Sequence, residues 1–242
     1  MILGVSNIEI FRVFFDVVME YRDTVELFAN EVGVKVSILS NNHSCFYEVF
    51  YDKDFFDIFE VEGNEVVSLF IDDLHTILKS ASKNECMTLS TDDNFVHLKF
   101  EKDGNRRVFE LVQAQSFNDT PAMPSIDLNC CFDIDIANLE RSFKDIELVK
   151  TNGVSMVKKG DDLILGTDET AQTNYSHTIK VYGEGDAVAR YSVNYLNDLV
   201  KFKKISSEIT IEFSDDMPFV WTCERDGVKV KGLIAPLMGV EE

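Results

Sequence analysis

The sequence lacks the residue patterns that mark secreted, membrane-spanning and zinc-binding proteins. Its five cysteines, Cys45, Cys86, Cys130, Cys131 and Cys223, are odd in number, and no two form a CxxC pair. This argues against a disulfide framework or a zinc ribbon and favours a reducing cytosol. No run of about 18 apolar residues predicts a membrane helix. The opening residues, MILG, lack the basic segment of a signal peptide, so none is expected.

Basic residues are also scarce. The chain has 23 Lys and Arg against 43 Asp and Glu, which gives a net charge of −20 over 242 residues. Such a charge argues against a general nucleic-acid binder, because phosphate binding needs clustered basic side chains. Any role on DNA would require a local basic surface. Hydrophobic residues make up 45% of the chain, enough for a core in one large domain or in two domains of about 120 residues each.

Motifs for chemistry are missing as well. There is no HExxH and no P-loop, and the histidines are far apart: His43, His75, His97 and His177. We therefore expect no catalytic residue, no metal and no cofactor. Four acidic pairs, each of which could bind Mg²⁺, leave open a metal-dependent hydrolase, although adjacent acids are more typical of solvated turns. The pairs are Asp72-Asp73, Asp92-Asp93, Asp161-Asp162 and Asp215-Asp216.

What the chain does contain is an internal repeat. Asp72–Lys79 and Asn194–Lys201 have the same helical pattern 122 residues apart, and a strand-like run follows each of them. In both segments apolar residues at i, i+3 and i+4 predict one buried helix face. The other positions predict two exposed polar stripes, each ending in a lysine. These stripes are Asp72, His75, Thr76 and Lys79, and Asn194, Asn197, Asp198 and Lys201.

Each half has a similar order of predicted elements. Helical spacing from Ile8 to Val18 opens the first half, and the same spacing from Leu139 to Ile146 opens the second. Short alternating runs predict strands. They are Val34–Leu39, Phe46–Tyr51, Val66–Phe70, His97–Phe100, Val108–Val112, Val154–Val157, Leu163–Leu165, His177–Val181 and Val228–Ile234. Helices among several strands, without βαβ alternation, indicate an α+β fold.

The segment between the halves predicts a linker. Residues 115–127, QSFNDTPAMPSID, hold Pro121 and Pro124, and proline resists both helix and central strand. We therefore expect an N-terminal domain at 1–114, a linker at 115–127 and a C-terminal domain at 128–242.

Several segments, in the right order and spacing, resemble the archaeal–eukaryotic DNA sliding clamp, PCNA. The resemblance runs from end to end, and no single segment is a catalytic signature. The segments are Phe59–Gly63, Leu74–Ser80, Leu139–Val149, Tyr195–Asn197 with Lys201, Ile209–Phe213, Ser214–Pro218 and Ile234–Pro236.

The resemblance implies two similar clamp domains, with helices inside and sheets outside, in subunits that close head to tail into a trimeric ring. Val108–Val112 would pair with the region around His177–Val181 of a neighbouring subunit. Such a ring encircles double-stranded DNA without reading its sequence and tethers replication and repair enzymes. The implied partners are DNA polymerase, a clamp loader, and ligase and flap-nuclease segments, with no membrane.

A homotrimer is the favoured assembly, and a subunit of a mixed ring is the alternative. A clamp-like structural protein that has lost DNA binding also stays open. The implied location is the cytoplasm and nucleoid of an archaeon, or the nucleus of a eukaryote.

The resemblance also implies residues for DNA contact and for partner docking. The DNA-facing positions are Arg12, Lys79, Arg141, Lys144 and Lys201. The chain departs from the family in its first helix, where Glu9, Asp16 and Glu20 share a polar stripe with Arg12. The peptide pocket would use Leu39, Ser44, Phe46, Pro218, Leu233, Ala235 and Pro236, with Phe117 and Met123 as lids. Phe46 and Leu233 alternate along strands, so a core position is the alternative for these two residues.

Overall fold

The computed structural model describes residues 1–242 except 83, 93, 117–120, 168–172 and 238–242. The chain divides into two compact units. Unit 1 contains Met1–Asn41, Tyr47–Ala122 and Glu224–Val230, and unit 2 contains Asn42–Phe46, Met123–Cys223 and Lys231–Glu242. Two short segments thus belong with the other half of the chain, which the sequence did not predict. The domain boundaries expected at 114 and 128 stay a prediction.

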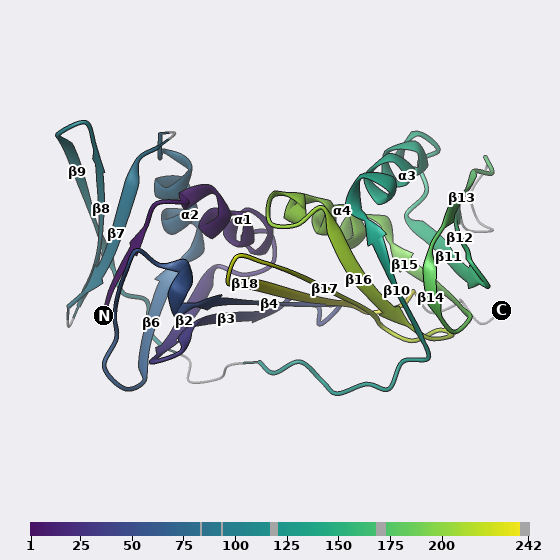
Figure 1. The fold of residues 1–242 in the computed structure, drawn as a ribbon, viewed down its shortest axis with the longest axis horizontal. Coiled ribbons are helices and arrows are strands. Elements are labelled where there is room, and N and C mark those ends of the chain that lie inside the picture. Colours follow the sequence, from purple (N-terminus) through teal and green to yellow (C-terminus); the bar gives the residue numbers. More distant parts are fainter. Residues whose placement is uncertain (83, 93, 117–120, 168–172, 238–242) are drawn as a thin grey trace. The chain divides into compact units, whose positions relative to one another are not determined.

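The first half contributes strands to two antiparallel sheets and contains two α-helices (Figure 1). One sheet has the order β5-β1-β7-β8-β9, and another series runs β4-β3-β2-β6. The elements are β1 (Ile2–Val5), α1 (Ile8–Val18), β2 (Thr24–Asn30), β3 (Gly33–Leu39), β4 (Cys45–Asp52), η1 (Lys53–Phe55), β5 (Ile58–Glu60), β6 (Glu65–Phe70), α2 (Ile71–Lys79), β7 (Cys86–Thr91), β8 (Phe95–Lys102) and β9 (Asn105–Val112).

The second half repeats this order of helices and strands. Its strands run β13-β12-β11-β15 and β14-β10-β16-β17. The elements are β10 (Cys130–Asp135), α3 (Ile136–Leu148), β11 (Gly153–Lys159), β12 (Asp162–Thr167), β13 (Ser176–Lys180), β14 (Tyr182–Glu184), β15 (Ala187–Ser192), α4 (Val193–Lys201), η2 (Phe202–Lys204), β16 (Glu208–Phe213), β17 (Phe219–Arg225) and β18 (Val228–Ile234). The α+β fold and the internal repeat are therefore confirmed.

Helix α1 shows why these segments fold where they do. The Asn7 side chain caps its start by accepting a hydrogen bond from the Ile10 N–H at 3.3 Å. Its apolar face is buried, with Phe11, Phe14 and Phe15 almost without solvent contact. The Tyr51 hydroxyl donates to the Phe11 carbonyl at 2.8 Å, so its polar end is satisfied inside the core. Aromatic burial of this kind holds the helix against the sheet.

The predicted polar stripes are wrong at two positions. His75 is only 9% exposed and Asp198 only 4% exposed, although both were expected on solvated faces. In unit 1, α2 packs against α1, and the His75 side chain meets Asp16 there. Asp198 is covered as well, and its carboxylate pairs with Lys201. Helix periodicity alone does not show that a second helix covers part of a polar face.

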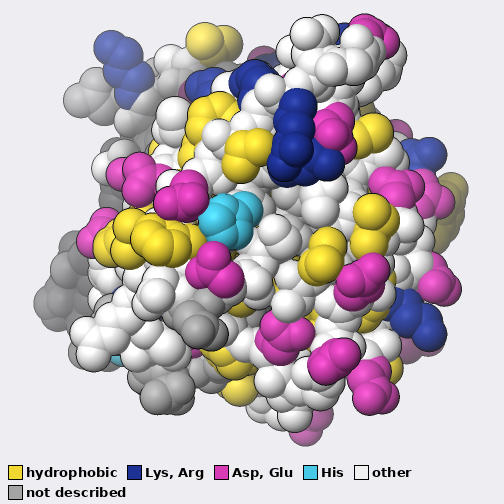
Figure 2. Space-filling view, turned by 90° about the vertical axis from the view of Figure 1, so that its left-hand side faces the viewer, with side chains coloured by type: hydrophobic (Ala, Val, Ile, Leu, Met, Phe, Trp, Pro, Cys, Tyr) yellow, Lys and Arg dark blue, Asp and Glu magenta, His cyan; other side chains and the backbone are white. Residues whose placement is uncertain are grey.

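Strands β9 and β13 each lie at the end of their sheet. Val108 and Val112 on β9 are 51% and 63% exposed, although they are apolar. Figure 2 views the molecule from the side on which β9 lies, where hydrophobic side chains occur among acidic ones. Both segments therefore have the edge position expected of strands that pair with another chain.

Across the ranges that the structure describes, no helix has the length and apolar character needed to cross a membrane.

Candidate functional site

The helices of unit 1 carry two of the basic residues singled out in the sequence. Arg12 is half-buried, and its Nε lies 3.4 Å from the Asp16 carboxylate, one turn further along α1. The same carboxylate oxygen lies 2.9 Å from His75 Nε2 on α2. Asp16 therefore offsets the Arg12 charge while it joins the two helices. Lys79, at the exposed end of α2, forms no ion pair with any described residue.

The helices of unit 2 carry more positive charge. Arg141 and Lys144 are exposed on α3, and Lys144 Nζ lies 2.8 Å from the Glu140 carboxylate. Lys203 Nζ reaches the same carboxylate at 2.9 Å. Hydrogen bonds from Lys144 and Lys203 hold the pKa of Glu140 below its usual value. The single Glu140 carboxylate thus pairs with two ammonium groups, so the surface around Glu140 carries one more positive than negative charge.

Sequence reasoning missed the lysines that follow α4. Lys201 was singled out, and its Nζ is paired with Asp198 at 2.8 Å. Lys203 and Lys204 lie in the next turn, η2, and both are exposed. The signal was present as the run Lys201-Phe202-Lys203-Lys204, in which Phe202 is fully buried and so directs its neighbours outward.

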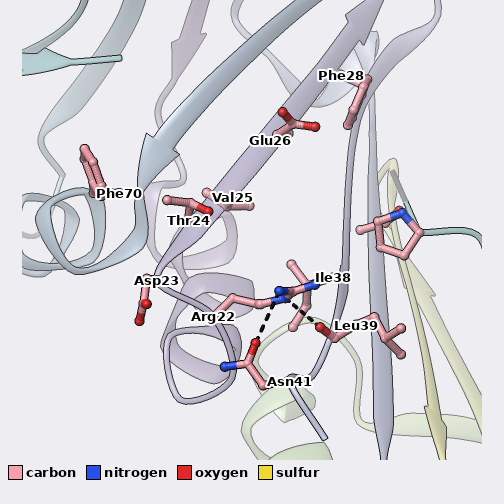
Figure 3. Close-up of a pocket in the computed structure, with 12 residues that line it drawn as sticks. Arg22, Asp23, Thr24, Val25, Glu26, Phe28, Ile38, Leu39, Asn41 and Phe70 are labelled. Carbon is pink, nitrogen blue, oxygen red and sulfur yellow. Dashed lines mark hydrogen bonds between the residues drawn. The ribbon is translucent and has the colours of Figure 1, made fainter. Parts of the chain in front are cut away.

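Unit 1 also has a surface hollow of about 500 Å³ on β2 and β3 (Figure 3). The Arg22 side chain forms part of its wall, donating from Nε to the Leu39 carbonyl at 2.7 Å and from Nη1 to Asn41 at 3.2 Å. Aromatic rings of Phe28 and Phe70 also line it, with Pro121 from the segment predicted to be a linker. Of the predicted pocket residues that the structure describes, only Leu39 lines this hollow, because the pattern did not show which side chains of β2 point outward.

In unit 2, other predicted pocket residues come together. The Ala235 N–H donates to the Ser44 carbonyl at 2.8 Å, and the Leu237 N–H donates to the Arg190 carbonyl at 2.7 Å. Ser44, Ala235 and Pro236 are half-buried, so their surfaces are partly accessible. Pro218 is half-buried as well, directly after Met217, whose carbonyl accepts from the Tyr191 hydroxyl at 2.8 Å.

The remaining predicted pocket residues differ in their surroundings. Phe46 and Leu233 are only 2% and 8% exposed, which matches the core position that their alternation allowed. Met123 is half-buried, and Phe117 lies outside the described residues. Two of the expected wall residues are therefore covered in the single chain.

The structure offers little for metal chemistry. Within the described part of the chain, no group of three or more His, Cys, Asp or Glu side chains could hold a metal ion. Three of the histidines contact polar side chains nearby in space instead: His75 contacts Asp16, His97 contacts Asp92, and His177 contacts Ser142.

The acidic pairs fall on several kinds of element. Asp92 and Asp215 lie in turns, where each carboxylate accepts backbone hydrogen bonds. Asp72 and Asp73 form the first turn of α2, so a solvated turn was the wrong expectation for that pair. Acids at a helix start are stabilised by the positive end of the helix dipole.

Comparison with known proteins agrees with this architecture. Residues 4–119 match the family model described as "Proliferating cell nuclear antigen, N-terminal domain". A DNA polymerase sliding clamp of Methanothermobacter thermautotrophicus is 24% identical over 238 residues, which cover 96% of both chains. DNA polymerase sliding clamp 3 of Sulfurisphaera tokodaii is 25% identical over 229 residues, covering 88% of this chain and 89% of the relative.

Among solved structures, the crystal structure of a PCNA2-PCNA3 complex from Sulfolobus tokodaii has a chain with the same fold. The TM-score is 0.88 at 19% identity, over 98% of this chain and 99% of that one. The resemblance to the PCNA family is thus confirmed: residues 4–119 belong to its N-terminal domain, and the clamp fold extends over nearly the whole chain.

Proposed function

We propose that this PCNA-family chain is a subunit of a DNA sliding clamp, which encircles duplex DNA and tethers DNA polymerase to it. The observation that carries the proposal is the clamp fold over 98% of the chain, repeated in both halves and ending in two open edges, β9 and β13. The sliding-clamp names of the relatives support it. The chain itself performs no chemistry in this proposal, because tethering raises the local concentration of other enzymes.

DNA contact is assigned to the basic residues of the helices. They are Arg12, Lys79, Arg141, Lys144 and Lys201, together with Lys203 and Lys204. Lysine and arginine on helix surfaces bind phosphate without reading bases, as sliding requires. The overall charge of −20 does not prevent this, because affinity for phosphate depends on the local field.

Ring closure is assigned to strand pairing between β9 of one subunit and β13 of the next. Exposed Val108 and Val112 would be covered in such a contact. We propose a ring of identical subunits, in which each copy contributes one β9 and one β13. Head-to-tail contacts of this kind close when the rotation between subunits suits their number.

A mixed ring is the second candidate, and the acid-rich first helix favours it. Glu9 and Asp16 stand beside Arg12 on α1, so a neighbour of different sequence would have to supply positive charge on that side. The complex of two different PCNA chains from Sulfolobus tokodaii shows that the fold occurs in such a pairing.

The solution mass separates the two candidates. The chain mass is 27.5 kDa, and we expect light scattering to give about three times that value at micromolar concentration. A stable monomer or dimer would overturn the homotrimer and leave the clamp fold intact. The same sample, loaded on circular DNA and then challenged with salt, tests retention. Loss of all retention in a closed trimer would favour a structural protein without DNA binding.

Partner docking is proposed for short peptides with aromatic or aliphatic anchors. Ser44, Ala235, Pro236 and Pro218 in unit 2, and the hollow at Leu39 in unit 1, would receive them. Segments from polymerase, clamp loader, ligase and flap nuclease are the expected ligands. A peptide with two aromatic anchors, titrated by fluorescence anisotropy, should lose at least about tenfold affinity with Ala235→Glu. Lys229→Glu introduces the same side chain on β18, at a residue that pairs with Glu224, and is the control for an added glutamate.

The hydrolase alternative has its own test. The purified chain is incubated with Mg²⁺ and linear DNA, with and without EDTA. We expect no cleavage in either case. Cleavage that EDTA abolishes and that Asp72→Asn with Asp73→Asn removes would support the hydrolase instead.

A further inference from the structure

Strand β9 is attached to the segment that follows α2 through Arg107. Side chains alternate along β9, so Val108 points to the exposed face and Arg107 to the opposite one. Arg107 Nη2 donates to both carboxylate oxygens of Glu85, at 2.9 and 2.8 Å. Arg107 Nε adds a third hydrogen bond to Glu85 at 3.2 Å. This is a forked pairing, the strongest form of arginine–carboxylate contact.

The Glu85 carboxylate is held from a second direction. The Ser82 N–H donates to Glu85 Oε2 at 2.7 Å, and the Glu85 side chain is only 7% exposed. Burial raises the pKa of Glu85, but the Ser82 hydrogen bond and Arg107 outweigh it, so the pKa lies below its usual value. Glu85 therefore stays ionised near neutral pH, and the pair is an ion pair there.

Arg107 also reaches the end of α2 directly. Nη1 lies 3.2 Å from the Ser80 hydroxyl, and Nη2 lies 3.4 Å from the Ser80 carbonyl. The Ser80 hydroxyl donates to the Ile77 carbonyl at 2.7 Å, which caps the last turn of α2. Lys79, assigned above to DNA contact, is the residue before Ser80.

Two aromatic rings fix the guanidinium from the sheet side. Its carbon lies 5.1 Å from the Phe100 ring centre and 5.6 Å from that of Phe109. Phe100 is directly opposite Arg107 in the β8–β9 register, and the two rings meet edge to face. A guanidinium held by a carboxylate and by ring faces has few other rotamers, so it positions the backbone on which it stands.

We propose that Arg107 is a positioning residue that holds the edge strand β9, and with it the ring contact, in a fixed place relative to the end of α2. The inference rests on the proposed clamp function. Among the described strands, β9 pairs with β8 alone, so the backbone groups on its other side are left for a partner. An edge that is already ordered loses less conformational entropy when it pairs. The pair with Glu85 supplies that order from the covered face of the sheet.

The test compares three substitutions with a matched control. Arg107→Ala removes the pair, Arg107→Lys keeps the charge but loses the fork, and Glu85→Gln keeps the size but loses the anion. Arg225→Ala removes an exposed arginine whose one ion pair with a described residue is to its neighbour Asp226, and it serves as the control. Amide hydrogen exchange along β9 and the subunit dissociation midpoint are measured for each.

We expect faster amide hydrogen exchange in β9 for Arg107→Ala and Arg107→Lys. The protein concentration at which half of the subunits are dissociated should rise about tenfold, which means weaker assembly. Glu85→Gln should show the same pattern with a smaller change, and Arg225→Ala should match the unmodified chain. Combining Glu85→Gln with Arg107→Ala should add little to Arg107→Ala alone, because the two residues act as one pair.

The proposal is overturned if β9 exchange and the midpoint stay unchanged while only the melting temperature falls, since that is the effect of a merely stabilising contact. It is also overturned if Arg107→Lys behaves as the unmodified chain does. If the unmodified chain proves monomeric, the homotrimer fails on its own, and β9 exchange in the monomer still decides the role of Arg107.

Discussion

The helix pair α1 and α2 of unit 1 and the helix pair α3 and α4 of unit 2 bury similar apolar faces but differ in the charge of their polar faces. In unit 1, a polar contact between Asp16 and His75 at 2.9 Å joins α1 and α2. In unit 2, α3 and α4 are joined by a contact of the same kind, between Glu147 and Asn197 at 2.5 Å. The apolar faces are buried alike in both pairs. Yet α3, α4 and η2 together carry five Lys and Arg side chains, whereas α1 and α2 carry two, Arg12 and Lys79. The five are Arg141, Lys144, Lys201, Lys203 and Lys204.

This difference shows that the fold places helix surfaces without deciding their charge. Packing requires only the apolar stripe, so the polar stripe is free to vary. The acids on α1 lower the local potential, while the lysines around Glu140 raise it. If the chain contacts DNA as proposed, the second unit should supply most of the binding free energy.

The largest effect is expected on DNA binding. Replacing Arg141 and Lys204 by alanine should weaken DNA binding about a hundredfold at low salt. The slope of the logarithm of the binding constant against the logarithm of the salt concentration should become about two units less steep. Replacing Arg12 and Lys79 removes the same charge but should cost about tenfold or less, because Asp16 already offsets Arg12. Fluorescence titrations at several salt concentrations measure both. Equal losses in the two variants would contradict the comparison.

The next effect concerns the contacts between helices. His75→Ala should lower the free energy of unfolding by about 2 kcal/mol, because it removes the 2.9 Å contact between the mostly buried His75 ring and the Asp16 carboxylate. Asn197→Ala should cost only about 0.5 kcal/mol, since the Asn197 contact is exposed. Urea unfolding measures the two values. If the Asn197 variant were the less stable of the two, burial would not determine how much each contact contributes to the free energy of unfolding.

A smaller effect should come from the carboxylate between two lysines. Glu140→Gln releases Lys144 and Lys203, which both pair with it, and should tighten DNA binding about threefold. Glu224→Gln, which removes an acid from the end of β17, is the control and should change little. Binding is compared at one low salt concentration. An unchanged affinity for the Glu140 variant would show that these lysines do not face DNA.

The smallest effect lies in the acidic turns. A hydrogen bond from His97, with two from backbone N–H groups, lowers the pKa of Asp92 to about 2. Since the folded pKa is depressed, the stabilisation is complete above about pH 4 and is lost as the pH falls toward 2. His97→Gln should move the pKa of Asp92 upward, toward its ordinary value. Carbon-detected NMR titration measures this. A pKa that stays near 2 would assign the shift to the backbone alone.

The sequence predicted the order of elements well. The repeat at an offset of 122 residues, both pairs of helices and the runs named as strands are all found in the structure. The reason is that hydrophobic periodicity records which face of each element is buried. The clamp resemblance depended on the same patterns. The sequence did not predict the burial of His75 and Asp198, or the exchange of short segments between the units.

The candidate sites were predicted less completely. Three of the five residues predicted to face DNA are engaged in ion pairs, and the pairing of Lys144 with Glu140 could have been seen from its spacing of four. The hollow beside Leu39 could not have been predicted from the sequence, because it depends on which side chains of neighbouring strands share a face. Phe46 and Leu233 are buried by the fold rather than exposed in a groove.

By itself, the sequence determined the charge, the apolar faces and the repeat, because each can be read from the pattern of residue types along the chain. Tertiary structure alone decided which polar groups meet. Asp16 and His75 are 59 residues apart and Arg107 and Glu85 are 22 apart, yet each pair lies within hydrogen-bonding distance. Hydrophobic periodicity does not predict such contacts, because they form only when one buried face packs against another.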